Sequence, residues 1–307
     1  MSRSGREIVL LDGGMGQELI RRSKLPLTPL WSARMLLEEL ELVEDLHCAF
    51  IEAGARVITL NSYAATGPRL ARDGHADAFL PMQEAALKAA RRARDRAGRD
   101  VRIAGCLPPL VASYRADVVP SFADCLAEYR RIVEAQAAGV DLFLCETMTL
   151  DHEIRAATRA AAESGKPVWA AVTVDDQDAG KARSGQRLLD VAEAALDEGA
   201  RAVLVNCSTP EATGSAVSLL AGETRVFGAY ANGFTSIDAL EPGGTVEALQ
   251  TRRDLGTKDY ADHALGWARA GAAIVGGCCE IGPAHIAELA RRLSEEGYKI
   301  TARLDAP

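Results

Sequence analysis

The sequence predicts a single (β/α)8 barrel, a TIM barrel, that occupies the whole chain, residues 1–307. Eight apolar runs, each of about five to eight residues and rich in Val, Ile, Leu or Phe, alternate with amphipathic stretches, as expected for parallel strands buried on both faces. Several amphipathic stretches end in a glycine just before an apolar run, which is the usual left-handed end of a helix. The segments after strands are often long and those after helices short, and barrel active sites lie at the carboxyl ends of the strands.

The predicted elements alternate along the chain. We expect strands at residues 7–13, 56–63, 101–107, 141–147, 167–173, 202–208, 225–231 and 272–279. We expect helices at residues 33–52, 81–97, 122–137, 151–163, 188–197, 210–221, 258–269 and 283–297. The glycines expected to end helices are Gly54, Gly139, Gly165, Gly199 and Gly271. A doubly wound sheet is the alternative, but the segment LDGGMG lacks the G-x-G-x-x-G spacing of a dinucleotide-binding turn.

The composition is that of an acidic chain. The formal net charge is -8 and the pI is about 5.3, which argues against a nucleic-acid or anionic-membrane partner, because such a surface needs a basic stripe. No apolar run approaches the roughly 18 residues of a membrane helix, and the N-terminal apolar run is too short for a signal peptide. We therefore expect a cytoplasmic protein, as a monomer or small homo-oligomer, with small-molecule partners.

Seven cysteines in a long chain without an export signal argue against a disulfide framework. Four of them fall inside helical or strand-like patterns, where a small buried hydrophobe is the ordinary interpretation of a free cysteine. These four are Cys48, Cys106, Cys125 and Cys145. The other three end predicted strands and need a separate explanation.

Those three cysteines and two carboxylates converge on one rim of the predicted barrel. Cys207 ends the sixth strand, Cys278 and Cys279 end the eighth, and Asp12 and Glu146 end the first and the fourth. Three thiolates suit zinc, and three protein ligands with an open position describe a catalytic zinc site. The sequence therefore predicts a zinc site made of the three cysteines, with a vicinal disulfide and ordinary core packing as alternatives.

Adjacent cysteines point to opposite faces of a regular strand, so we expect the backbone to bend there, with Gly276 and Gly277 supplying the freedom. A substrate thiol at the open position would lose its proton readily, and the resulting thiolate suits an onium methyl donor. The predicted chemistry is alkyl transfer to a thiol. Three histidines lie on predicted helices or in a loop and are not obvious fourth ligands: His75, His263 and His285.

Six segments resemble, in order, motifs of the homocysteine S-methyltransferase family. They are LLDGGMGQEL, PLWSAR, AGARVITLNSY, CETMTLDHE, VNCSTPE and GGCCEIGPAHI, and the resemblance runs from about residue 10 to residue 293. The split NC…GGCC pattern is highly specific, and the others agree in order. The resemblance implies a (β/α)8 barrel with one zinc ion per chain held by Cys207, Cys278 and Cys279. It also implies that the thiolate of homocysteine completes the tetrahedron and accepts a methyl group, giving methionine.

The resemblance implies roles for further residues. Glu146 matches the glutamate that receives the ammonium group of homocysteine, and Asp12 lies in the turn that holds the amino-acid end. Trp31 and Tyr63 match aromatic positions near the methyl donor, whose onium group ring faces would hold. Asn206 and Asn232 are expected to brace zinc ligands or substrate. The remaining residues expected to bind substrate are Gly13, Gly14, Asn61 and Thr147.

The departures from the family pattern lie on the donor side. Gln17 and Leu60 stand where the family usually has threonine, and the segments 107–120 and 232–257 are unlike the common forms. The chain has no room for cobalamin or folate domains, so we expect a small donor, S-methylmethionine or a related sulfonium. A betaine-type quaternary ammonium donor is the alternative, and a zinc hydrolase or a non-catalytic zinc- or thiol-binding protein are alternatives of other classes.

Overall fold

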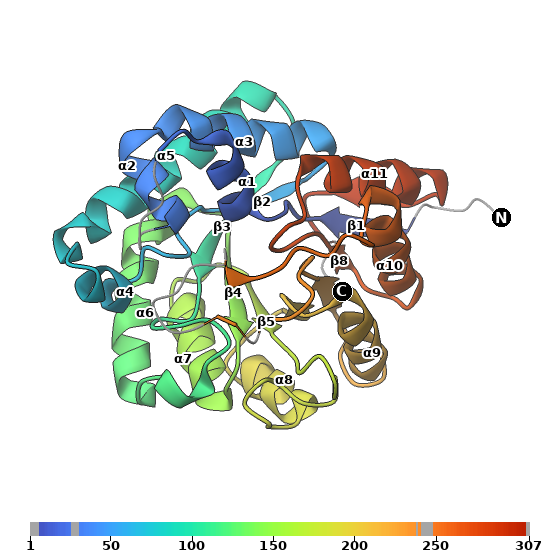
Figure 1. Cartoon of the computed structure of the whole chain (residues 1–307). Coiled ribbons are helices and arrows are strands. Elements are labelled where there is room, and N and C mark those ends of the chain that lie inside the picture. The colour runs from blue at the N-terminus through green and yellow to red at the C-terminus, as the bar shows by residue number, and fades with distance from the viewer. Residues whose placement is uncertain (1–5, 26–30, 238, 241–247, 305–307) are drawn as a thin grey trace.

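The computed structural model describes residues 6–25, 31–237, 239–240 and 248–304. Nine parallel strands form one curled sheet in the order β2-β3-β4-β5-β6-β7-β8-β1-β9, with the helices around it (Figure 1). The strands are β1 (Glu7–Leu10), β2 (Val57–Thr59), β3 (Arg102–Leu107), β4 (Leu142–Met148), β5 (Val168–Val172), β6 (Ala202–Asn206), β7 (Phe227–Tyr230), β8 (Ile274–Val275) and β9 (Lys299–Thr301). All eight predicted strands are present, and most end before their apolar run does, because the last residues turn into the loops of the rim.

The two strands that begin the chain also contact each other. Leu11 forms a parallel bridge with Val57, beside hydrogen bonds from Arg56 N to Leu10 O (2.8 Å) and from Asp12 N to Val57 O (3.0 Å). These bonds link the carboxyl end of β1 to β2, which stands at the far end of the strand order. The fold is therefore TIM-barrel-like.

Helices cover the outside of the sheet at the predicted places. Their bounds are α1 (Met15–Arg22), α2 (Met35–Glu38), α3 (Leu40–Ala53), α4 (Gly67–Arg72), α5 (Phe79–Ala97), α6 (Phe122–Gln136), α7 (Asp151–Ala162), α8 (Leu188–Asp197), α9 (Pro210–Leu220), α10 (Thr257–Arg269) and α11 (Pro283–Glu295). The first predicted helix, at residues 33–52, is divided into α2 and α3, because the backbone leaves the helical conformation at Glu39 (φ -137°, ψ 50°). The sequence did not predict β9, α1 or α4, although the Thr66 side chain accepts a hydrogen bond from Arg69 N and Pro68 lies in the first turn of α4.

Four of the five predicted glycine ends are confirmed. Gly54, Gly165, Gly199 and Gly271 have φ between 75° and 120°. The prediction for Gly139 is wrong, because α6 continues into a short 3-10 turn (Ala137–Gly139) and the chain leaves it without a left-handed residue. A Cβ there would lie 2.4 Å from the end of the Leu87 side chain, so that side chain would have to move.

Alternation along the strands divides the core into two layers. In β4, Leu142 and Leu144 belong to the cluster inside the curled sheet, whereas Phe143 and Cys145 pack in the layer beneath the helices. Successive side chains of a strand point to opposite faces, so Glu146 follows Leu144 on the inner face. The hydrophobic pattern thus places a carboxylate at the end of the barrel interior. Among the described residues, no helix is both long and apolar enough to span a bilayer.

A buried histidine in α3 generates a stability prediction. The His47 side chain is 0% exposed, and neither ring nitrogen has a hydrogen-bond partner in the described part of the chain. Burial lowers its pKa to about 4, so on acidification the unfolded chain binds a proton before the folded chain can. This linkage removes about 3 kcal/mol of stability between pH 7 and pH 4.

We expect His47→Met to abolish that loss. Denaturant unfolding should give a variant that gains about 3 kcal/mol relative to the wild type as the pH falls from 7 to 4. A stability difference that does not change with pH would show that His47 takes up a proton in the folded chain.

Candidate metal centre and active site

Three thiols meet at the carboxyl end of the sheet. The Sγ atom of Cys207 lies 2.8 Å from that of Cys278 and 3.7 Å from that of Cys279, and all three lie within 4.8 Å of one another. All three cysteines are free thiols, so the alternative of a vicinal disulfide is wrong. Within the described ranges this is the one group of three or more Cys, His, Asp or Glu side chains close enough to hold a metal ion.

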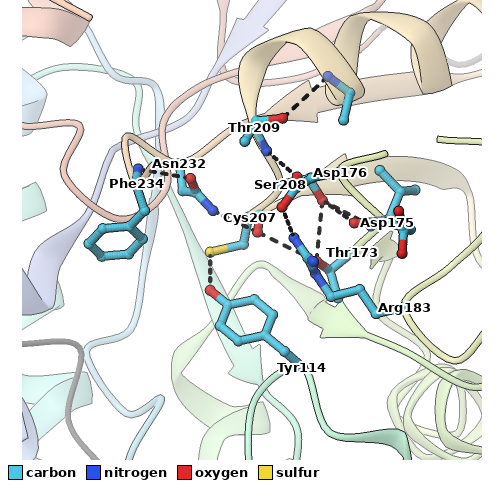
Figure 2. A network of polar contacts seen from close by, with 12 residues as sticks. Tyr114, Thr173, Asp175, Asp176, Arg183, Cys207, Ser208, Thr209, Asn232 and Phe234 are labelled. Atoms are coloured by element: carbon cyan, nitrogen blue, oxygen red, sulfur yellow. Dashed lines mark hydrogen bonds and ion pairs between the residues drawn. The ribbon is translucent and has the colours of Figure 1, made fainter. Parts of the chain in front are cut away.

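Cys207 has an unusual backbone conformation and is held by hydrogen bonds with residues at the end of β7. Its φ of 52° turns the chain at the end of β6, and its N–H donates to the carbonyl of Tyr230 (3.1 Å). The Asn232 side chain donates to the carbonyl of Cys207 (2.8 Å) and accepts from the N–H of Phe234 (3.0 Å), as Figure 2 shows. Asn232 therefore fixes the backbone of one cysteine, which agrees with the expectation that it braces this centre.

The bend at the cysteine pair is real, but its expected cause is wrong. The left-handed residue is Glu280 (φ 69°), and neither Gly276 nor Gly277 has a positive φ. The two glycines are required by crowding instead: a Cβ would lie 2.5 Å from Leu11 Cβ at position 276 and 2.3 Å from Ile281 Cγ2 at position 277.

The turn after β1 packs directly against the cysteine turn. A Cβ on Gly13 would lie 2.0 Å from the carbonyl oxygen of Ile281, and one on Gly14 would lie 2.6 Å from that of Cys278. The N–H of Gly14 donates to the Ile281 carbonyl (2.9 Å). Any side chain at these glycines would separate the two turns, so the Gly-Gly pair sets the distance between Asp12 and the thiols.

Two buried carboxylates face the same space. Asp12 is 4% exposed and accepts hydrogen bonds from the N–H (2.8 Å) and the hydroxyl (3.4 Å) of Thr59. Glu146 is 9% exposed, with the Cys106 thiol at 3.0 Å and the Tyr230 hydroxyl at 3.5 Å. Burial raises the pKa of Asp12 to about 8 and that of Glu146 to about 7. No Lys, Arg or His among the described residues forms an ion pair with either one, so both lack a cation.

One pocket collects most of the predicted residues. Those that line it are Asp12, Gly13, Gly14, Asn61, Tyr63, Glu146, Cys207, Cys278 and Cys279. Thr147 and Asn232 are fully buried and do not line it. The side chain of Trp31, and residues 238 and 241–247 of the divergent segment 232–257, lie outside the described residues.

The remaining predicted residues shape the rim by hydrogen bonds. Thr147 has a φ of 62° where β4 shifts register against β5, and its N–H donates to the Asn206 side chain (2.9 Å). The side-chain amide of Asn206 donates a hydrogen bond to the Thr147 hydroxyl (2.9 Å). Asn61 bonds the carbonyl of Ser32 (3.3 Å), and Tyr63 bonds the hydroxyl of Ser113 (2.8 Å).

Tyr114 is a site residue that the sequence did not predict. Its hydroxyl lies 2.9 Å from the sulfur of Cys207, and its ring lies 5.3 Å from the guanidinium of Arg183 (Figure 2). Burial opposes ionisation of Cys207, but hydrogen bonds from the thiols of Cys278 and Cys279 and from this hydroxyl lower its pKa overall. Tyr114 lies in the divergent segment 107–120, where the family motifs gave no guide.

Cys106 and Tyr230 were also missed as site residues. Cys106 was expected to be a small buried hydrophobe; it is buried, but its thiol contacts Glu146. Both residues belong to predicted strands, and both project toward the carboxylate at the end of β4. Only the register of β3, β4 and β7 could have revealed this contact.

The donor set of the three cysteines fits a zinc ion. Zinc accepts sulfur ligands in a tetrahedron, and the three sulfurs are close enough together to surround one ion. No histidine or carboxylate of the described residues joins them, and all three line the pocket, which leaves a ligand position for a substrate. The buried carboxyl groups beside them would be stabilised in their ionised form by a cationic group.

Comparison with known proteins agrees with this geometry. The homocysteine S-methyltransferase family model matches residues 9–293. The chain is 33% identical to the homocysteine S-methyltransferase of Escherichia coli (strain K12), over 94% of this chain and 96% of the relative. The crystal structure of the homocysteine methyltransferase MmuM from Escherichia coli in its metallated form is similar with a TM-score of 0.78 at 30% identity, covering 94% of this chain and 96% of that one.

The apo form of the same Escherichia coli protein is similar with a TM-score of 0.70 at 28% identity, covering 94% of this chain and 96% of that one. The family match extends over nearly the whole length, and the similarity holds in both sequence and structure. The chain therefore belongs to the homocysteine S-methyltransferase family and is an enzyme of that class.

Proposed function

We propose that this enzyme transfers a methyl group from a small sulfonium compound, S-methylmethionine or a close relative, to the thiol of homocysteine, with zinc held by Cys207, Cys278 and Cys279. The observation that carries the proposal is the meeting, in one pocket, of three thiols and two buried carboxylates without cations. The similarity to a metallated homocysteine methyltransferase supports the metal.

The carboxylates account for the amino-acid end of homocysteine. An ammonium group between Glu146 and Asp12 would replace the missing cation and favour the ionised form of both groups. Cys106 and Tyr230 each contact one oxygen of the Glu146 carboxylate, which favours its orientation toward the pocket. The turn of Gly13 and Gly14 keeps the amino-acid end of homocysteine at a fixed distance from the cysteines.

The cysteines account for the reacting end. A zinc ion at this centre would supply the positive charge that lowers the pKa of the substrate thiol and so makes it a nucleophile at neutral pH. Asn232 and Tyr114 keep Cys207 in place through its carbonyl and its sulfur. Thr147 and Asn206 tie the end of β4 to that of β6, which holds Glu146 and the first cysteine in register.

The donor binds on the aromatic side of the pocket. Tyr63 lies on this wall, and a ring face attracts an onium methyl group. By the family resemblance Trp31 adds a second ring and Asn61 a polar contact. A lone pair of the homocysteine sulfur forms the new bond to the methyl carbon. The carbon–sulfur bond of the sulfonium breaks with its electron pair, which leaves a neutral thioether and forms methionine.

The whole chain forms one domain built on a closed (β/α)8 barrel. The bridge between Leu11 and Val57 and its flanking hydrogen bonds support closure between β1 and β2. The enzyme works in the cytoplasm on free small molecules, as a monomer or small homo-oligomer, without a nucleic-acid or membrane partner; the acidic charge of -8 supports this part of the proposal.

The donor is tested by methionine formation with homocysteine and the zinc-loaded protein. S-methylmethionine, dimethylsulfoniopropionate and glycine betaine are offered separately. We expect turnover with a sulfonium and none with the betaine. Turnover with glycine betaine alone would move the enzyme to quaternary ammonium donors, and no turnover with any of them would reject the donor class.

Removal of one proposed ligand should remove both the metal and the activity. We expect Cys207→Ser to lose zinc, measured per chain by elemental analysis, and to lose methionine formation, because two thiolates hold zinc far less tightly than three. The matched control is Cys48→Ala in α3, a buried cysteine outside the pocket, which should keep both. Full activity of Cys207→Ser would contradict the proposed centre.

Loss of the Glu146 charge should weaken homocysteine binding without loss of zinc. We expect Glu146→Gln to lower kcat/KM for homocysteine by about 10- to 100-fold, as for the loss of a buried charge-assisted hydrogen bond. Glu153→Gln is the control, because Glu153 is equally buried but accepts bonds from Thr149, away from the pocket.

The raised pKa of Glu146 predicts a pH dependence. Below about pH 7 the group is protonated in the ligand-free enzyme, so homocysteine affinity should fall as the pH drops from 8 to 6. Calorimetric titrations across this range should show the fall in the wild type and a flatter profile in Glu146→Gln. Equal slopes for the two proteins would assign the dependence to another group.

A further inference from the structure

A half-buried arginine lines the proposed substrate pocket and has no role in the function described so far. Arg69 lies on α4, in the wall that also contains Tyr63 and Ser113. Its Nη2 atom donates to the carbonyl of Pro109 (3.0 Å) and to the hydroxyl of Ser113 (3.3 Å). Its guanidinium carbon lies 5.3 Å from the centre of the Tyr63 ring.

The charge of Arg69 is not compensated by the described part of the chain. No Asp or Glu of the described residues lies within ion-pair distance of its guanidinium, and its Nε is buried without a hydrogen-bond partner. Arg72, on the same helix, instead forms a two-point ion pair with Asp73 (2.8 and 2.9 Å). A charge that is partly removed from water and has no ion-pair partner is unfavourable unless something else in the pocket supplies the opposite charge.

The guanidinium has the geometry to receive a carboxylate. Arginine has five N–H donors in a planar fork that matches the two oxygens of a carboxylate, and only Nη2 of Arg69 is used by the protein. The carboxyl groups of Asp12 and Glu146 and the three thiols line the same space and complement its charge, whereas Arg72 and Asp73, which also line the pocket, pair with each other. A zwitterionic ligand would therefore find acceptors for its positive group and, at Arg69, a donor for its negative group.

We propose that Arg69 binds the carboxylate of a substrate and thereby restricts this enzyme to carboxylate-bearing substrates. This inference rests on the proposed function, in which homocysteine and S-methylmethionine each carry one carboxylate. The position of Arg69 against the Tyr63 ring and Ser113, on the proposed donor side, favours the carboxylate of the methyl donor. The experiment separates the two sources.

A purely structural role is the competing explanation. The bonds from Arg69 to Pro109 and Ser113 also hold the segment 107–120 in place, and this segment carries Tyr114 at Cys207. Loss of such a brace would weaken every ligand of the pocket, whether or not the ligand has a carboxylate. The readout must therefore compare ligands that differ only in that group.

The test uses calorimetric titration of the zinc-loaded wild type, Arg69→Met and Arg69→Lys. Each protein is titrated separately with homocysteine, the carboxamide of homocysteine, S-methylmethionine and the carboxamide of S-methylmethionine. The control is Arg130→Met on α6, which removes one positive charge from an exposed arginine outside the pocket, paired with Glu163, and leaves Arg69 in place. The control should keep the wild-type preference for acid over amide.

We expect Arg69→Met to weaken binding of one acid by about 10- to 100-fold and to leave its amide unchanged, with partial recovery in Arg69→Lys. The pair that shows the effect identifies the source of the carboxylate. Equal loss for acid and amide, unchanged binding of both acids, or a wild type that prefers neither acid to its amide would overturn the proposal.

Methionine formation by the wild type is measured in parallel and tests the function separately. Binding that depends on the carboxylate without methionine formation would reject the proposed reaction and keep Arg69 as a carboxylate receptor. Methionine formation by the wild type, together with unchanged binding in Arg69→Met, would keep the proposed reaction and reject Arg69 as a carboxylate receptor.

Discussion

The contact between two backbone turns is the constraint on which the site depends. The turn of Gly13 and Gly14 after β1 lies against the carbonyls of Cys278 and Ile281 after β8, so closely that no side chain fits between them. This contact brings Asp12 to the same pocket as the cysteine pair. Because β1 also pairs with β8 and contacts β2, the whole curled sheet keeps the two turns together. The crowding explains why four glycines, at positions 13, 14, 276 and 277, surround the centre.

The charges of the pocket determine what it can bind. Three thiols line it together with Asp12, Glu146 and the ion pair of Arg72 and Asp73, and burial raises the pKa of Asp12 and Glu146 because ionisation there has no compensating cation. The proposed function uses this arrangement for three positive groups: a metal ion at the sulfurs, an ammonium group at Glu146 and an onium methyl near the rings. Arg69 supplies the opposite charge, which is why a zwitterion suits the pocket better than a simple cation.

The sequence predicted the parts of this protein that depend on periodicity and strand order. All eight strands are present because buried parallel strands are continuous apolar runs, and the three cysteines meet because the carboxyl ends of such strands share one rim. Tyr114, Arg69 and the contact of Cys106 with Glu146 could not be predicted in this way. They depend on the path of the segments 64–79 and 107–120 and on strand register, which local patterns do not encode. The prediction of a left-handed helix end at Gly139 was wrong because α6 continues into a 3-10 turn there, and the glycine lies against the Leu87 side chain instead.

The most direct test of the central claim is X-ray absorption at the zinc edge of the zinc-loaded enzyme, recorded without and with homocysteine. If Cys207, Cys278 and Cys279 hold zinc with one position left for substrate, the ion should have three sulfur neighbours alone and four with homocysteine. Fewer than three sulfur neighbours in the free enzyme, or a sulfur count that homocysteine does not change, would contradict the proposed centre.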